Sequence, residues 1–180
     1  MIEIRWHGRG GQGSFTVARM LGAAAVAEGK YAQAFPSFGP ERRGAPVTGF
    51  TRIDTKKILN RSEAMQPDYV VVMDETLLGS AVTEGVKTSG TLLINTNNPQ
   101  KYAKITAGFR VIAIDATSLA LAALGRPISN VAMLAALTAA SSIVGTDSTE
   151  EAIRESLSGV TVDRNIELFR TAYHQVKGGL

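Results

Sequence analysis

The sequence predicts an α/β domain with a mainly parallel sheet, helices on both faces of that sheet and an antiparallel hairpin addition. Three observations favour this fold class. Short apolar runs, typical of buried strands, alternate with segments of helical spacing. The stretch 47–59 has the pattern of two strands joined by a tight turn, and the C-terminal third shows helical spacing throughout. We therefore expect a single domain over residues 1–180, with a helical C-terminal third wrapped around the sheet.

The strands are expected from two kinds of pattern. Ile2, Ile4 and Trp6 alternate with polar residues, which indicates a first strand with one buried face. Later strands are expected at 31–35, 47–53, 69–73, 91–95 and 111–114. A short return strand at 56–59 would complete the hairpin with 47–53, through a turn at Asp54 and Thr55.

The helices are predicted from apolar residues that recur every three to four positions. The first is expected over 14–28, with Ser14 as its N-cap and Gly29 directly after its end. A helix or helical turn is expected around 75–86. The C-terminal third is expected to hold four helices, at 116–124, 131–144, 150–157 and 163–176.

Composition excludes several classes of function. The chain has 180 residues, 44% of them hydrophobic and 19% charged, which is typical of a globular domain. A net charge of +3 on scattered basic residues gives no reason to expect a nucleic acid partner. With no cysteine, this chain cannot form a disulfide, a thiolate zinc site or an ordinary iron–sulfur site. The sequence shows neither a signal peptide nor a run of the ~18–20 apolar residues that a membrane span needs, so we expect a cytoplasmic protein.

A glycine-rich loop between the first strand and the first helix is the first candidate site. It consists of Gly8, Arg9, Gly10, Gly11, Gln12 and Gly13, with the spacing G-x-G-x-x-G. Backbone amides in such a loop, together with a helix N-terminus, suit an anion. No acidic residue lies in 33–37 to bind a ribose, which disfavours an NAD site and hence an NAD-dependent dehydrogenase. The loop is interpreted as a site for a phosphate-bearing ligand or a partner, or as a tight turn.

The second candidate site is a loop over 37–46, restricted by glycine and proline. It contains Glu41, Arg42, Arg43 and Gly44. Arginine side chains suit carboxylates or phosphates, although both arginines could also point to solvent. The two loops together form the predicted ligand- or partner-binding set, and neither a catalytic residue nor a metal site is predicted.

The remaining unusual residues are interpreted structurally. His7 has no acid partner near it in sequence and is taken as a structural histidine. Asp74 and Glu75 are expected to begin a helix, and Asn95 to belong to a turn. Three methionines are expected in the core: Met20, Met73 and Met133.

The two loops, in this order, resemble those of the gamma subunits of pyruvate/ketoisovalerate (2-oxoacid):ferredoxin oxidoreductases. Segments 68–75 and 130–137 resemble later blocks of the same family, so the likeness covers essentially the whole chain. Gamma subunits of the 2-oxoglutarate type tend to have Ala-Arg-Gly-Gly where this chain has Arg42, Arg43, Gly44 and Ala45. The sequence of the loops is therefore more similar to that of the pyruvate group.

The resemblance implies a role inside a larger enzyme. Such complexes oxidatively decarboxylate a 2-oxoacid with coenzyme A to acyl-CoA and CO2, using thiamine diphosphate, Mg and iron–sulfur clusters. It implies alpha, beta and ferredoxin-like delta subunits as partners, and ferredoxin or flavodoxin as the electron acceptor. Because this chain has neither cysteine nor a Gly-Asp-Gly motif, the cofactors are expected on the partner subunits. The chain is expected to be inactive alone and to assist assembly or bind coenzyme A. The alternative is a free-standing nucleotide- or CoA-binding module of Rossmann-like type.

Overall fold

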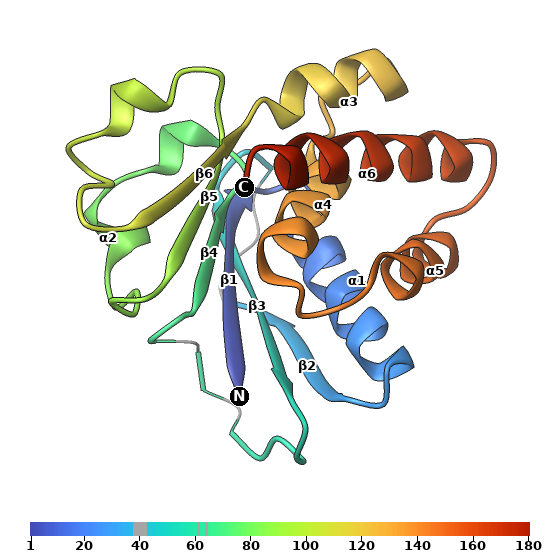
Figure 1. Cartoon of the computed structure of the whole chain (residues 1–180), viewed down its shortest axis with the longest axis horizontal. Coiled ribbons are helices and arrows are strands. Elements are labelled where there is room, and N and C mark those ends of the chain that lie inside the picture. The colour runs from blue at the N-terminus through green and yellow to red at the C-terminus, as the bar shows by residue number, and fades with distance from the viewer. Residues whose placement is uncertain (38–42, 61, 64) are drawn as a thin grey trace.

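A computed structural model describes residues 1–37, 43–60, 62–63 and 65–180 of the chain. Its strands are β1 (Ile2–Arg9), β2 (Tyr31–Pro36), β3 (Pro46–Asp54), β4 (Tyr69–Val72), β5 (Thr91–Asn95) and β6 (Arg110–Ile114). They form one sheet in the order β2-β3-β1-β4-β5-β6 (Figure 1). The strand β3 runs antiparallel to both of its neighbours, and the β1-β4-β5-β6 part is parallel. The α/β fold class is therefore confirmed.

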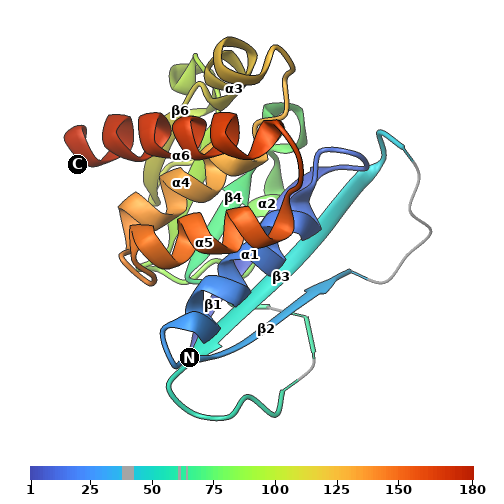
Figure 2. The same cartoon turned by 90° about the vertical axis from the view of Figure 1, so that its right-hand side faces the viewer.

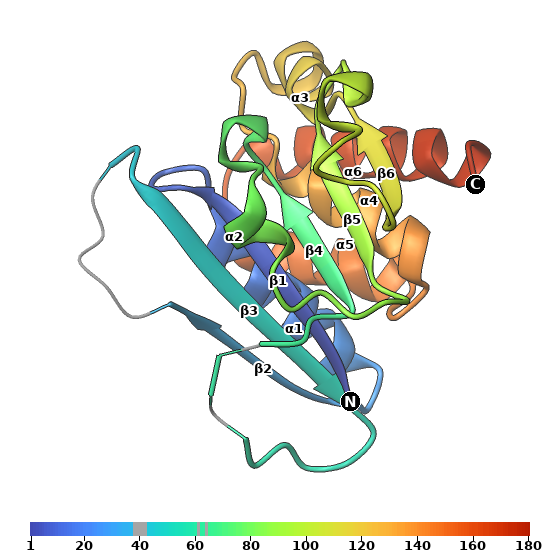
Figure 3. The same cartoon turned by 90° about the vertical axis from the view of Figure 1, so that its left-hand side faces the viewer.

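Helices cover the sheet unequally. The longer helices are α1 (Ser14–Ala27), α3 (Ala116–Leu124), α4 (Asn130–Ser141), α5 (Thr146–Ser156) and α6 (Thr161–Gly178). They pack on one face and form the larger core with it (Figure 2). The other face, seen in Figure 3, carries the short elements η1 (Glu75–Leu77), α2 (Ser80–Thr83) and η2 (Pro99–Tyr102) over a smaller core. In the described ranges, no helix is both long and apolar enough to cross a membrane.

The strand β1 lies inside the sheet. One of its faces is apolar, and a charged side chain on the other face is hydrogen-bonded within the chain. Ile4 and Trp6 are fully buried on the face covered by the long helices. The indole N–H of Trp6 donates to Thr51 Oγ1 at 3.1 Å, so its polar atom is satisfied in the core. On the opposite face, the Arg5 guanidinium donates to the carbonyls of Val82 and Glu84 at 2.7 and 2.8 Å. These bonds explain how β1 tolerates a buried arginine.

The antiparallel addition is confirmed, but the expected return strand at 56–59 is wrong. These four residues, all described, form no strand. The strand β3 pairs instead with β1 and β2, with Ile53 opposite Ile2 and Asp54 opposite Tyr31. Asp54 Oδ1 accepts the backbone N–H of Thr55 at 2.7 Å, which forms a local turn and directs the chain away from the sheet.

Two details of the helices also differ from expectation. Ser14 is the first helical residue rather than the N-cap, which is Gly13 in a left-handed conformation with φ 78°. The helix or helical turn expected around 75–86 is present as two short helical elements, η1 and α2, rather than one continuous helix. An extended Gly79 separates them. The four C-terminal helices are confirmed, with ends that shift by a few residues.

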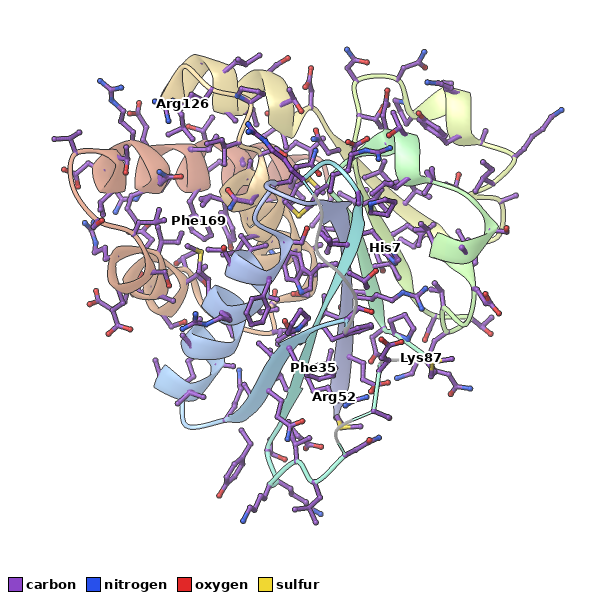
Figure 4. All side chains as sticks on the ribbon, turned by 180° about the vertical axis from the view of Figure 1, so that it is seen from behind. His7, Phe35, Arg52, Lys87, Arg126 and Phe169 are labelled. Carbon is purple, nitrogen blue, oxygen red and sulfur yellow. The ribbon has the colours of Figure 1, made fainter. Side chains whose placement is uncertain are left out.

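The sheet face opposite the long helices buries charge in its β2-β3-β1 half. Arg52 is only 1% exposed, and its Nε donates to Glu3 Oε1 at 2.6 Å. Its guanidinium also lies over the Phe35 ring, 5.5 Å from the centroid (Figure 4). A buried cation needs such partners to offset its lost hydration.

Candidate functional site

The strand order makes the carboxyl ends of the parallel strands the expected place for a site. These strand ends are called the sheet edge below. After β1 the chain moves to β2 and β3 on one side, and after β4 it moves to β5 and β6 on the other. The neighbours β1 and β4 are parallel, so their carboxyl ends meet where the direction of travel reverses. In open α/β sheets ligands bind at this switch point. The glycine loop follows β1 here, and Asp74 follows β4.

The structure brings the two predicted loops together. Gly10 donates its N–H to the carbonyl of Ala45 at 2.8 Å and accepts the N–H of Gly44 at 3.0 Å. A β-bridge also joins Gly10 to Arg43. The base of the second loop is therefore fixed against the first. Glu41 and Arg42, the other two residues predicted in that loop, lie outside the described residues.

Arg9 is engaged inside the chain. Its Nε donates to Asp74 Oδ2 at 3.1 Å, forming an ion pair. Its Nη1 donates to the Gly44 carbonyl at 3.0 Å, and its Nη2 to Thr76 Oγ1 at 2.7 Å. All three guanidinium nitrogens thus have partners. The positive charge of Arg9 is therefore largely balanced by Asp74.

The Asp74 carboxylate accepts more hydrogen bonds than a helix cap requires. Its expected role in beginning a helix is confirmed, because its side chain accepts the Thr76 N–H at the start of η1. The same carboxylate accepts from Gln12 Nε2 at 3.1 Å as well as from Arg9. Burial alone would raise the pKa of Asp74. The hydrogen bonds from Thr76 and Gln12 and the charge of Arg9 outweigh it and hold that pKa below the ordinary value.

A pocket of about 560 Å³ lies between the glycine loop, the first turn of α1 and the ends of β2 and β3. The first-turn amides of a helix have no partner within the helix and carry a partial positive charge. Ser14 lines this pocket and is only 2% exposed, yet its hydroxyl has no hydrogen-bond partner among the described residues. Arg43 is exposed at the base of the neighbouring loop. The pocket is thus suited to an anionic group.

Sequence reasoning missed two polar contacts around this edge. Asn95, expected both to end the strand 91–95 and to begin a turn, is the buried last residue of β5 and donates to the Met73 carbonyl at 2.9 Å. Its Oδ1 also accepts the Thr117 N–H at 3.2 Å, so Asn95 links the residue that follows β4 to α3. Asn130, the first residue of α4, lies directly against Gly13. The signal for Asn95 was present, since polar residues at the carboxyl ends of parallel strands face this edge.

His7 points to the sheet face opposite the long helices, away from Phe169 (Figure 4). Burial, together with the nearby charge of Arg5, lowers the pKa of His7 to about 4. The imidazole is therefore neutral at physiological pH. Its Nε2 is buried with no partner among the described residues. The structural interpretation of His7 stays a prediction. The three methionines are confirmed in the core.

Comparison with known proteins places this arrangement in context. The family model described as pyruvate ferredoxin/flavodoxin oxidoreductase matches residues 3–175. The common gamma subunit of pyruvate/ketoisovalerate oxidoreductases from Pyrococcus furiosus is 47% identical over 181 residues, which cover 98% of each chain. A solved structure of pyruvate oxidoreductase subunit PORC from Thermotoga maritima has a TM-score of 0.85 and 39% identity, covering 96% of this chain and 95% of that one. The 2-oxoglutarate:ferredoxin oxidoreductase of Magnetococcus marinus shares the fold, with a TM-score of 0.81 and 16% identity over 99% of this chain and 31% of that one.

Proposed function

Since this chain belongs to the pyruvate ferredoxin/flavodoxin oxidoreductase family, as a gamma-type subunit, we propose that it is the non-catalytic subunit that binds coenzyme A phosphate where its two loops meet. The enzyme to which such subunits belong is a multisubunit oxidoreductase. One observation carries the proposal. Gly11 and Gly13 line the pocket at the N-terminus of the 14-residue α1, and a β-bridge to Gly10 brings the exposed Arg43 to the same loop.

The proposed ligand follows from the chemistry of this edge. Phosphate oxygens accept hydrogen bonds from loop amides and from a helix N-terminus. Because Asp74 balances Arg9, Arg43 is the described arginine of the two loops that is left to supply charge. The Magnetococcus enzyme, which shares this fold, was solved with coenzyme A bound, and this supports the same ligand class. With no cysteine here, iron–sulfur clusters are assigned to partner chains, and we place thiamine diphosphate there as well.

A second role for the same arginine is contact with a partner subunit. Arg43 is exposed on a loop at the surface, where a carboxylate of the alpha, beta or delta subunit would reach it as readily as a phosphate. The two roles predict different failures, so one variant distinguishes them.

Replacing Arg43 with alanine in the reconstituted complex is expected to weaken one equilibrium by about 10- to 100-fold. A shielded charge-assisted hydrogen bond contributes ~1.5–3 kcal/mol, and ~1.4 kcal/mol corresponds to a factor of ten. A raised apparent KM for coenzyme A, with normal co-purification, supports the ligand role. Loss of co-purification supports the partner role. Arg126→Ala, at an exposed arginine in the connection between α3 and α4, is the control. Normal kinetics and normal assembly in Arg43→Ala would reject both roles.

The isolated chain is expected to show no oxidation of pyruvate with coenzyme A and a viologen dye. It has no cysteine to hold a cluster that would carry electrons. The measurement is dye reduction by the purified chain, and then by the same preparation after the partner subunits are added. Turnover before that addition contradicts the non-catalytic assignment.

A further inference from the structure

The ion pair of Arg9 and Asp74 sits between three segments that are far apart in sequence. Arg9 is the last residue of β1, Asp74 and Thr76 follow β4, and Gly44 belongs to the second loop, 37–46, called the arginine loop below. One guanidinium group donates to all three partners through three different nitrogens. This side chain therefore ties the second loop, 35 residues away in the chain, to the sheet edge, in addition to the backbone bonds of Gly10.

The glycine loop is fixed by the same carboxylate. Gln12 donates to Asp74 Oδ2 at 3.1 Å, and its own Oε1 accepts the backbone N–H of Arg9 at 2.7 Å. Asp74 thus holds the first loop through Gln12 and the second loop through Arg9. Its other oxygen is occupied by the Thr76 N–H at 3.0 Å, which sets the orientation of the carboxylate.

We infer that Arg9 and Asp74 are positioning residues, which hold the arginine loop against the glycine loop and so fix Arg43 relative to the first turn of α1. This inference rests on the proposed role of Arg43. It assigns Arg9 a different task from anion binding, since its donors are used within the chain. Lysine cannot replace this arginine, because an ammonium group lacks the rigid, planar fork that reaches three partners at once.

The test is a double-mutant cycle in the reconstituted complex, with Arg9→Lys, Arg43→Ala and the double variant. Arg9→Lys is expected to move whichever quantity Arg43→Ala moves, either the apparent KM for coenzyme A or the yield of complex, by about tenfold, which corresponds to ~1.4 kcal/mol. In the Arg43→Ala background the same change is expected to add less than about twofold, because Arg9 acts through Arg43. If the fold-changes of the two single variants multiply in full in the double variant, the inference is overturned.

A direct readout separates this inference from the proposed function. Amide hydrogen exchange of peptides covering 43–46 is expected to be faster in Arg9→Lys and in Asp74→Asn than in the unsubstituted complex. If exchange is unchanged in both variants, the positioning role is overturned whatever the kinetics show. If exchange is faster but Arg43→Ala is silent, the two residues still hold the loops together and the proposed function alone is overturned.

A matched control lies at the other end of β4. Lys87 pairs with Asp68 at 2.7 Å, and both pairs are partly exposed to a similar degree. Asp68 precedes β4, whereas Asp74 follows it, so Lys87→Gln breaks a comparable ion pair far from the loops. This variant is expected to leave the kinetics and the exchange of 43–46 unchanged. Its thermal unfolding curve also gives the loss of stability against which Arg9→Lys and Asp74→Asn are judged.

Discussion

Replacement of Gly13 with alanine is expected to destabilise the chain by about 2–4 kcal/mol and to prevent normal assembly. Gly13 has φ 78°, a left-handed conformation that costs an L-residue ~1–2 kcal/mol. A Cβ atom there would also lie 2.5 Å from Asn130 Nδ2, so the buried Asn130 side chain at the start of α4 would have to move. Such overpacking typically costs about 1–3 kcal/mol. The measurement is the free energy of unfolding in denaturant, followed by co-purification with the partner subunits.

The chain offers a matched control for this substitution. Gly11 has φ 96°, but a Cβ there would meet nothing within 4 Å. Gly11→Ala is therefore expected to show the conformational cost alone. Asn130→Ala in the Gly13→Ala background is expected to recover part of the loss, judged against Asn130→Ala by itself. Equal effects of Gly11→Ala and Gly13→Ala would show that the contact with α4 contributes nothing.

Acid is expected to destabilise the chain through His7, by about 3 kcal/mol between neutral pH and pH 4. The pKa of His7 falls from 6.5 to about 4 in the folded state, because burial disfavours the charged form. Between these values the unfolded chain binds a proton that the folded chain does not, so stability is fully present above the upper value. It is lost as the pH falls through this window, at ~1.4 kcal/mol per unit.

Unfolding midpoints measured from pH 7.5 to 4.5 check this expectation. His7→Gln, which does not titrate, is expected to flatten the slope of stability against pH. His174 is the matched control, because it is exposed on α6, and His174→Gln is expected to leave the slope unchanged. Carboxyl groups titrate mainly below this range, so the difference between the two variants isolates His7. An unaltered slope in His7→Gln would assign the acid sensitivity to other groups.

Much of the fold was readable because its signals are local. The continuous apolar runs that became β4 and β5 and the spacing of the C-terminal helices depend only on near neighbours in sequence. The position of β3 in the sheet, in contrast, depends on residues that are far apart in sequence. It pairs with β1, Ile53 opposite Ile2, and a period-two pattern says which face is buried but not which distant strand lies alongside. A nearby return strand was therefore expected where the structure has a long-range pair.

The signals for the site residues are likewise local for some residues and long-range for others. The glycine loop and Arg43 stood out by composition, and the structure joins them through Gly10. Asp74 was interpreted mainly as a cap, and its pairing with Arg9 has no local signal, since Arg9 is 65 residues away. The contact between Gly13 and Asn130 spans an even longer separation and has no local pattern at all. Contacts between loops that converge at one edge of a sheet follow from topology, which the sequence alone does not specify.

The place of β1 in the sheet has a consequence for how the chain is made. This strand is the first to be synthesised, yet its partners β3 and β4 are complete only at Asp54 and Val72, and the helices that cover Ile4 and Trp6 continue to Gly178. At about 5–20 residues per second, β1 waits several seconds for its neighbours and longer for its cover. Throughout that interval a nascent chain presents an unpaired strand with an apolar face. We therefore expect the yield of folded subunit to respond strongly to chaperone supply and to the rate of translation.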